Sequence, residues 1–330
     1  MSGSIVVSSR VRLARNYADL PFRGKMNPEQ SEACVQRTLD ALRQLPQAYS
    51  FLSLRGMEAN EKKALVEAHL ISPDLMEHEE TGAVLIRRDE KISVMMNEED
   101  HLRIQGFSQG ENLTEAAESA FSIDDELQKQ LSFAFDAQWG YLTACPTNAG
   151  TGLRASVMLH LPMLTMLKQM GKVHQLAAKV GLTLRGIYGE GSEAQGNLYQ
   201  LSNQVTLGRT EKEIIDAVAA TARQMAQMEQ VFRQKAQDKD PVAFEDPLFR
   251  SYGLMRYARR MSIKEFMNHW SNLRLGASLE KLPVSLETCD ALLTAAQPAH
   301  VQKAAGSALE AKDVDAYRCE LIRNAINGGK

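Results

Sequence analysis

The stretch CPTNAGTGLRASVMLHLP, residues 145–162, constrains this chain most, because a loop with a proline and two glycines leads directly into an alternating segment. Alternation with a period of two is typical of a β-strand that buries one face. The residues predicted to face the core are Leu153, Ala155, Val157 and Leu159. Those predicted on the opposite face are Arg154, Ser156, Met158 and His160. Arg154 is therefore expected to face a cleft, within ten residues of Cys145.

Composition favours a globular protein with two domains, because 330 residues exceed the ordinary size of one domain. A net charge of −3 gives no general attraction for nucleic acid or an anionic membrane. Apolar runs are too short to span a membrane, and the first ten residues lack the apolar core of a signal peptide, so we expect a cytoplasmic protein. The four cysteines are far apart, which argues against a zinc site and a disulfide framework.

The segment SIVVSSRVRLARN, residues 4–16, reads as a strand that places Arg10 and Arg12 together on one side. Taken alone, this segment favours a solvated edge strand that carries arginines. A helix is expected over 27–45, and another over 60–70 that brings His69 near its C-terminal end. Strands are expected over 83–87 and 92–96 around a tight turn.

Acidic residues follow in NEEDHLRI, residues 97–104, where the same alternation predicts Glu99, His101 and Arg103 on one face of a strand. Metal binding by this run ranks low, because consecutive strand residues point in opposite directions. Residues 112–136 are predicted to form one long helix. Its expected core contacts are Phe121, Leu127, Leu131 and Phe135.

A further strand leads into RGIYGEGSE, residues 185–193. Arg185 would be costly inside an apolar strand without a partner, which favours a functional role, and Glu190 lies in a glycine-rich loop. Residues 211–233 are expected to form an amphipathic helix. The polar segment 234–246 then separates a domain of residues 1–236 from a helical domain of residues 237–330.

Arginines on strands next to loops recur along the chain. They are Arg10, Arg12, Arg103, Arg154 and Arg185. The planar guanidinium donates paired hydrogen bonds to phosphate oxygens and keeps its charge, so several arginines indicate a polyphosphate. No GxxxxGK[ST] loop, kinase HRD or DFG motif, or GxGxxG after the first strand is present. An arginine-built nucleotide site is therefore the remaining interpretation.

Four motifs together, SSRVRLARN, NEEDHLRIQ, CPTNAGTGLRASV and RGIYGEGSE, resemble the guanidino-kinase (phosphagen kinase) family over about residues 4–210. The tail resembles its bacterial protein arginine kinase branch, the McsB type, in RSYGLMRYARRMS, RLG and QPAHVQK. The resemblance implies an α+β fold with a mainly antiparallel sheet backed by helices and a small all-helical C-terminal domain. It also implies in-line transfer of the ATP γ-phosphoryl group to arginine side chains of proteins.

Carried over by motif, the resemblance implies catalytic roles for Glu99, Glu190 and Cys145. The two carboxylates would hold the acceptor guanidinium, one would accept its proton, and Cys145 would orient it as a thiolate. The residues assigned to ATP are Ser8, Ser9, Arg10, Val11, Arg12, His69, Arg103, Arg154, Ala155, Ser156, Val157, Met158, Arg185, Gly186, Ile187, Tyr188 and Gly189. Mg²⁺ is expected on the ATP phosphates and water, with no dedicated metal site in the protein.

The implied partners are protein substrates with exposed arginines, an McsA-type activator, the CtsR repressor and the ClpC protease system, with a homodimer by family analogy. The branch usually carries an RDxxRA motif for phosphoarginine. Here the aligned segment reads VDAYRC, so Asp315 and Arg318 match but Val314 replaces the first arginine. We therefore expect phosphoarginine feedback to be weakened or absent. Two other functions remain open: a kinase for free arginine or another small guanidino compound, and a non-catalytic adaptor that binds client proteins.

Overall fold

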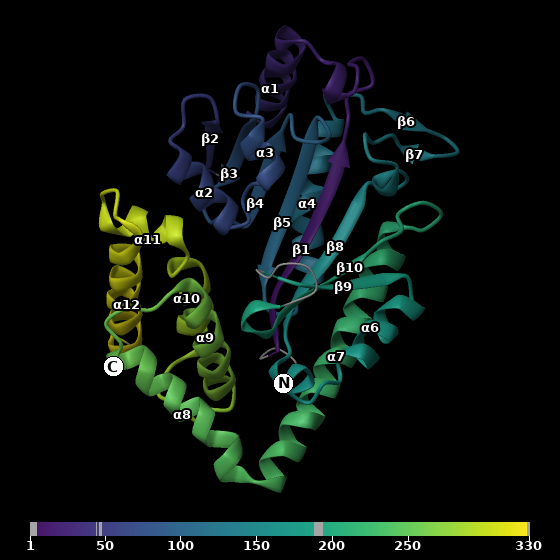
Figure 1. The fold of residues 1–330 in the computed structure, drawn as a ribbon. Helices are drawn as coiled ribbons and strands as arrows, with labels where there is room; N and C mark the ends of the chain where they lie inside the picture. The colour runs from purple at the N-terminus through teal and green to yellow at the C-terminus, as the bar shows by residue number, and fades with distance from the viewer. Residues whose placement is uncertain (1–4, 44, 46–47, 188–193, 329–330) are drawn as a thin grey trace.

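A computed structural model describes residues 5–43, 45, 48–187 and 194–328 of the chain. Its centre is an eight-stranded sheet in which every pair of neighbours is antiparallel (Figure 1). In order across the sheet, the strands are β2 (Tyr49–Ser53), β3 (Ala83–Arg87), β4 (Ile92–Met96), β5 (Leu102–Gln109), β1 (Val6–Arg15), β8 (Leu153–His160), β10 (Leu198–Asn203) and β9 (Leu182–Gly186). The predicted α+β class and antiparallel sheet are confirmed.

Strand β1 lies at the centre of the sheet and sets its two faces. Val11 and Leu13 are fully buried, as the alternation predicts. Arg12 is paired with Arg154 of β8 and with Gln105 of β5. Because directly paired residues of antiparallel strands project to the same side, these side chains share one face. We call this the arginine face and the opposite one the rear face.

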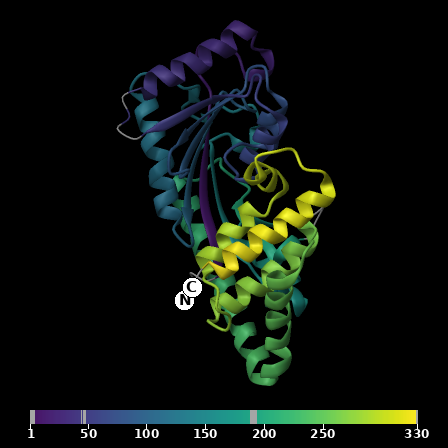
Figure 2. The same ribbon diagram turned by 90° about the vertical axis from the view of Figure 1, so that its left-hand side faces the viewer.

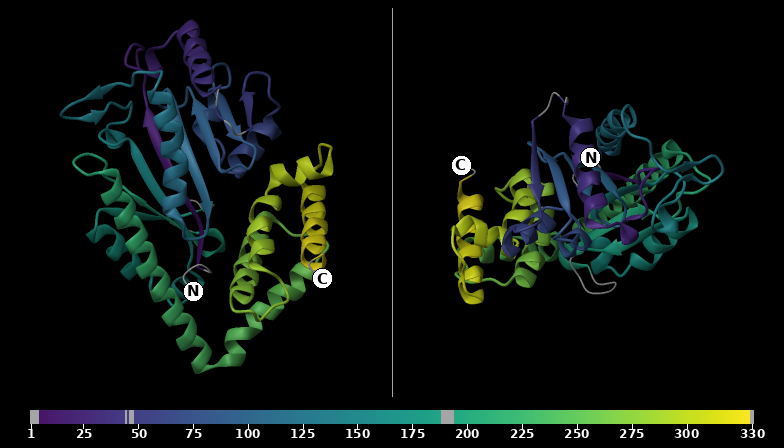
Figure 3. Two further views of the ribbon diagram at one scale, coloured as in Figure 1. Left: turned by 180° about the vertical axis from the view of Figure 1, so that it is seen from behind. Right: turned by 90° about the horizontal axis from the view of Figure 1, so that it is seen from above.

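Helices cover the rear face and bury the apolar side of the strands (Figure 3, left). They are α1 (Pro28–Leu42), α4 (Leu113–Gln128), α6 (Met170–Lys179) and α7 (Glu211–Lys239). The start of α1 follows from its sequence, because Asn27 and Gln30 form a reciprocal capping box. On the arginine face, α2 (Ala59–Glu67) and α3 (Pro73–Glu77) pack over β3 and β4 with a small apolar cluster of their own.

The C-terminal part is entirely helical where the structure describes it, as predicted. Its helices are α8 (Pro241–Tyr257), α9 (Ile263–Ser278), α10 (Leu286–Ala295), α11 (Pro298–Ala305) and α12 (Ala311–Asn327). Helix α7 continues past residue 236 to Lys239, and the chain turns at Asp240, which caps α8. The helices surround the buried Trp270, and α11 lies beside α2 (Figures 1 and 2), where Glu67 accepts hydrogen bonds from the backbone of Ala299 and His300.

Shorter elements complete the fold: helix α5 (Pro162–Met166), the 3-10 turns η2 (Arg23–Lys25), η3 (Pro146–Asn148) and η4 (Gln195–Asn197), and a hairpin of β6 (Phe135–Asp136) and β7 (Gly140–Tyr141). Within the described parts of the chain, no helix combines the length and apolar character needed to cross a membrane.

Two predictions of secondary structure are wrong. Residues 97–101 form a tight turn and not a strand, because Asn97 adopts a left-handed conformation and its amide bonds the His101 carbonyl. The predicted helix over 112–136 ends at Gln128, and the hairpin follows. Asp136 accepts hydrogen bonds from the amides of residues 138 and 139, and Gly140 has φ 70°, so turn chemistry outweighs helical spacing. Phe135, predicted as core, is 61% exposed.

Candidate active site

All five arginines singled out by the sequence lie on the arginine face. Arg10 and Arg12 come from β1, Arg103 from β5 and Arg154 from β8, and each of these is half-buried. Arg185, on the edge strand β9, is paired in register with Gln200 and is exposed. The expectation that it would be buried in its strand is therefore wrong, since it lies near the end of an edge strand.

The arginines repel one another in a partly desolvated setting. Burial lowers the pKa of Arg12 well below its ordinary value, and the charges of Arg10, Arg103 and Arg154 lower it further. Burial also lowers the pKa of Arg154, together with Arg185 and Arg103. The buried Nε of Arg154 has no hydrogen-bond partner in the described structure. A ligand with several anionic oxygens would relieve this repulsion and satisfy that donor, so the arginine face fits a triphosphate.

Two cavities open on the arginine face. One of about 240 Å³ lies beside Arg154 and Arg185 and reaches Thr147 in the loop after Cys145. A smaller one of about 50 Å³ is lined by residues that include Arg10, His69 and Ile187. The larger cavity is wide enough for phosphate groups. The smaller one lies between β1 and the end of α2, where it could receive another part of a nucleotide.

His69 lies directly after α2 in a left-handed conformation, with φ 60°. Burial and the nearby Arg10 lower its pKa to about 4, so the imidazole is neutral at pH 7. Neutral histidine can bond a nucleotide without adding to the positive charge of the arginines.

Replacing His69 by Asn tests this reading through the pH dependence of stability. A depressed histidine pKa means that the unfolded chain binds more protons than the native chain between about pH 6.5 and 4, so stability falls as the pH is lowered through that window. Asparagine also tolerates the left-handed backbone. His69→Asn should reduce the slope of the unfolding free energy against pH by up to about 1.4 kcal/mol per pH unit. Urea unfolding at half-unit pH steps measures it, and an unchanged slope would refute the buried neutral histidine.

The turn between β4 and β5 carries two carboxylates with different surroundings. Glu98 is fully buried, forms an ion pair with Arg103 and accepts a hydrogen bond of 2.5 Å from Ser72 Oγ. Glu99 is partly exposed, and its Oε2 lies 3.4 Å from Arg103 Nη2. Burial and the adjacent Asp100 raise the pKa of Glu99. Glu99 is therefore the more accessible of the two carboxylates. Its contact with Arg103 comes from a turn and not from a shared strand face.

The Cys145 loop lies against this turn because Asp100 joins them. Asp100 Oδ1 accepts hydrogen bonds of 2.7 Å from the Ala144 amide and 2.7 Å from Asn16 Nδ2. Glu99 directly precedes Asp100, and Cys145 directly follows Ala144. Cys145 Sγ lies 3.0 Å from Thr147 Oγ1 and is half-buried. The sequence pattern did not single out Asp100, although the acidic run NEED contains it.

Asp100 bonds the Cys145 loop to the turn that carries Glu99, so its removal should loosen both segments. We expect Asp100→Ala to lower kcat by about 10- to 100-fold while KM for ATP stays nearly constant, since the arginines are untouched. Asp100→Asn keeps an acceptor at the same place and should restore most of the rate. Steady-state kinetics of the two variants test this prediction. An equal loss of kcat in both variants, or a change only in KM for ATP, would contradict the positioning role.

Several residues assigned to ATP have side chains directed elsewhere. Val11, Ala155 and Val157 are buried in the rear-face core, so they can reach a nucleotide only through backbone atoms. Ser9 is also buried, and its hydroxyl donates to the Gly110 carbonyl. Tyr188, Gly189 and Glu190 lie outside the described residues.

The remaining assigned positions lie near the arginines. Ser8, Ser156 and Met158 line the smaller cavity with Ile187, which directly follows Gly186 at the end of β9. Gln200 and Ser202 of β10 are additional polar groups that the sequence analysis did not identify. They contact Arg10 at 3.4 Å and Arg154 at 3.1 Å, respectively.

The matching residues of the phosphoarginine motif form a structural contact in α12. Arg318 is buried, and its guanidinium donates to the carbonyls of Ala296 and Met261 and bonds Asp315. These bonds engage Arg318 Nε and Nη1 with the protein itself. Among the described residues, no cluster of three or more His, Cys, Asp or Glu side chains could hold a metal ion.

An antiparallel sheet with arginines clustered on one face, and with a carboxylate turn and a thiol loop joined at the ends of its central strands, fits a phosphotransferase. Two family profiles match the chain: "ATP:guanido phosphotransferase, C-terminal catalytic domain" over residues 30–232 and "Protein-arginine kinase McsB C-terminal domain" over residues 241–329. The chain belongs to the ATP:guanido phosphotransferase family, in the group of the protein-arginine kinases.

Curated relatives match along nearly the whole chain. A protein-arginine kinase of Caldanaerobacter subterraneus subsp. tengcongensis is 42% identical over 98% of this chain and 97% of that protein. One of Brevibacillus brevis is 45% identical over 98% of this chain and 92% of that protein.

Solved structures share the fold over most of the chain. The duplicated taurocyamine kinase of Schistosoma mansoni, solved with bound transition state analog components, has a TM-score of 0.63 and 30% identity; the match covers 72% of this chain and 34% of that protein. A lombricine kinase, with a TM-score of 0.61, 23% identity and coverage of 71% and 70%, supports the fold alone.

Proposed function

We propose that this protein transfers the γ-phosphoryl group of ATP to the guanidinium of arginine side chains in proteins. The observation that carries the proposal is the convergence of five arginines on one sheet face next to the joined loops of Glu99 and Cys145. Arginine guanidinium groups on one sheet face and a carboxylate beside them suit a reaction between a polyphosphate and a guanidinium.

On the donor side, Arg10, Arg12, Arg103, Arg154 and Arg185 bind and neutralise the phosphate oxygens. The unpartnered Nε of Arg154 supports this role, because a phosphate oxygen would complete its hydrogen bonding. Mg²⁺, held mainly by the phosphates and water, would add charge neutralisation during transfer. The fixed guanidinium forks align the γ-phosphoryl group for in-line attack.

On the acceptor side, a protonated guanidinium is a poor nucleophile, so it must lose a proton and be held in line with the phosphorus. Glu99 accepts that proton, and its raised pKa makes it a stronger base than an ordinary glutamate. Cys145, which follows Ala144 in the loop that is bonded to Asp100, orients the guanidinium from that loop. We keep Glu190 as a second carboxylate for the acceptor on the strength of its motif.

Substrate comparison tests the proposal against its two alternatives. The full chain is incubated with Mg·ATP and either free arginine or an arginine-bearing unstructured protein, and acid-labile phosphate on each is quantified. We expect transfer mainly to the protein. Transfer mainly to the free amino acid would establish a small-guanidino kinase, and inactivity with both under saturating Mg·ATP would favour the client-binding adaptor.

The wider setting follows from the family and completes the proposal. Phosphorylated proteins would be marked for degradation by a ClpC-type protease, with an McsA-type activator, in the cytoplasm, and the chain would form a homodimer. Residues 1–236 would act as the catalytic domain and residues 237–330 as a substrate or regulatory domain. The engagement of Arg318 by backbone carbonyls supports weakened feedback by phosphoarginine.

A further inference from the structure

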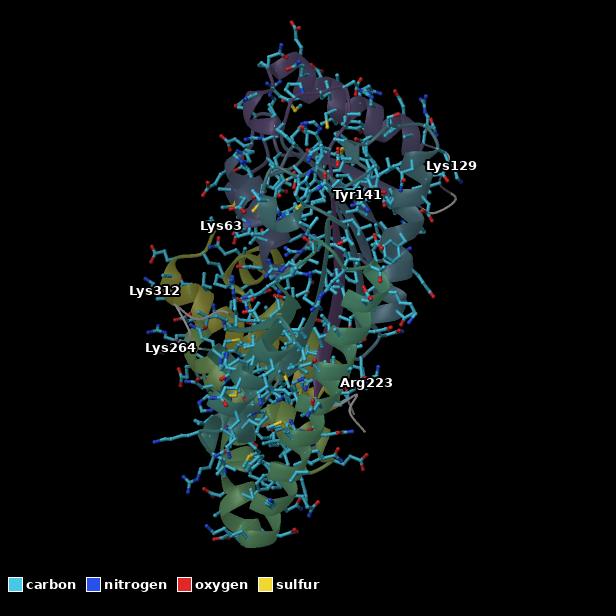
Figure 4. All side chains as sticks on the ribbon, turned by 90° about the vertical axis from the view of Figure 1, so that its right-hand side faces the viewer. Lys63, Lys129, Tyr141, Arg223, Lys264 and Lys312 are labelled. Carbon is cyan, nitrogen blue, oxygen red and sulfur yellow. The ribbon has the colours of Figure 1, made fainter. Side chains whose placement is uncertain are left out.

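A cavity of about 630 Å³ lies on the rear face and not among the arginines. One side of α4, the first turns of α7 and Tyr141 of the β6–β7 hairpin form its walls. Figure 4, seen from the right-hand side of Figure 1, shows Tyr141 in the upper half of the molecule with Arg223 of α7 below it. We call this cavity the rear groove. Its volume lies in the range of sites that bind small molecules or peptide side chains.

Negative charge predominates in the rear groove. Its two cations are already paired: Arg15 donates two hydrogen bonds to Asp124, at 2.9 and 2.7 Å, and Lys212 lies 2.5 Å from Asp216. The groove contains three further carboxylates that form no ion pair within the described residues. They are Glu118, Asp125 and Glu211. A cationic occupant would therefore be complementary to the groove.

Aromatic rings line the rear groove beside its carboxylates. Tyr141 and Phe121 line the rear groove, and Phe135 extends this wall by packing its ring against Tyr141 with centroids 5.3 Å apart. The wall already holds one guanidinium, because the Cζ atom of Arg15 lies 3.6 Å from the centre of the Tyr141 ring. Arginine and lysine have apolar stems and cationic ends, so a wall of aromatic rings and carboxylates suits them.

The rear groove is connected to the acceptor side of the active site by a short segment of chain. Tyr141 precedes Cys145 by four residues, and its amide bonds the Gly150 carbonyl at 2.8 Å. Asn16, next to Arg15, donates both to the Leu142 carbonyl and to Asp100. A polypeptide held in the groove would therefore lie against the segment that carries Cys145.

We propose that the rear groove binds a basic segment of the protein substrate that flanks the target arginine. This inference rests on the proposed function and adds a recognition site outside the catalytic residues. It explains why an exposed aromatic hairpin and unpaired carboxylates occur together next to the Cys145 loop. Substrates with lysine or arginine near the target should be preferred over neutral ones.

Binding of a fluorescent, acetylated lysine octapeptide tests the groove without requiring catalysis, because the peptide has no arginine to phosphorylate. The test variant combines Glu118→Gln, Asp125→Asn and Glu211→Gln. The matched control, Asp238→Asn with Glu310→Gln and Glu320→Gln, removes the same charge at exposed positions elsewhere. We expect the test variant to bind about tenfold more weakly than wild type, while the control binds within about twofold.

Kinetics then link the groove to substrate choice. The test variant should raise KM for a basic protein about tenfold while leaving kcat/KM for blocked arginine, N-acetylarginine amide, unchanged. The lysine peptide should compete with the protein but not with blocked arginine. Equal peptide binding by the test and control variants would overturn the proposal that the rear groove binds a basic segment. Absence of phosphoarginine on every substrate would instead overturn the proposed function. The peptide-binding result would still decide whether the rear groove binds a basic segment.

Discussion

Replacing Glu99 by Gln should lower kcat for arginine phosphorylation by about 10²- to 10⁴-fold, because Gln keeps the shape of the side chain but cannot accept a proton. KM for ATP should change by no more than about twofold, since Gln removes no cation from the phosphate site. The raised pKa of Glu99 also predicts that wild-type kcat falls on acidification at a pH above the usual glutamate range, because the carboxylate must be ionised to act.

Steady-state rates between pH 5 and 8 measure both effects. Glu80→Gln is the matched control, since the side chain of that glutamate is 74% exposed and pairs with the exposed Arg55. Its rate should equal that of wild type. A Glu99→Gln enzyme that retains most of its kcat would show that another group accepts the proton.

Arg12→Met should separate activity from stability. Arg12 lies among three other arginines that, together with burial, depress its pKa, so the free protein carries unfavourable repulsion at this point. Met keeps much of the volume and removes one charge. We expect kcat/KM for ATP to fall at least about 100-fold, while the free energy of unfolding without nucleotide rises by about 1 kcal/mol.

Urea unfolding with and without Mg·ATP measures both the stability of the free protein and its stabilisation by nucleotide. Wild type should gain stability from Mg·ATP by mass action, and Arg12→Met should gain little. Arg55→Met, at an arginine whose side chain is 70% exposed, controls for loss of charge without loss of the site. An Arg12→Met protein that is less stable than wild type yet uses ATP normally would contradict the view that repulsion is tolerated here for phosphate binding.

The strands that carry the arginines were predictable because period-two alternation is a local property. Leu153 and Val157 are buried and Arg154 faces the opposite side, as the pattern of β8 indicates. The common face of β1, β5, β8 and β9 was not predictable from spacing alone, because register between distant strands is set by tertiary packing. The resemblance to the guanidino-kinase family is what places these arginines in one site.

The failures have local causes. Strand alternation fails over residues 97–101, where the left-handed Asn97 reverses the chain and brings Glu99 to Arg103 from a turn. Helical spacing was continued through residues 129–136, although Asp136 and Gly140 favour a hairpin. That error concealed Phe135 and Tyr141, which belong to the rear groove. Asp100 was missed because its bond to Ala144 joins segments 44 residues apart.

The most direct test of the account is mass spectrometry at neutral pH of an arginine-bearing protein after incubation with this chain and Mg·ATP. The account predicts acid-labile phosphate on arginine nitrogens, retained with Glu80→Gln and lost with Glu99→Gln. Phosphate found on serine, threonine or tyrosine, or phosphoarginine formed equally by Glu99→Gln, would contradict it.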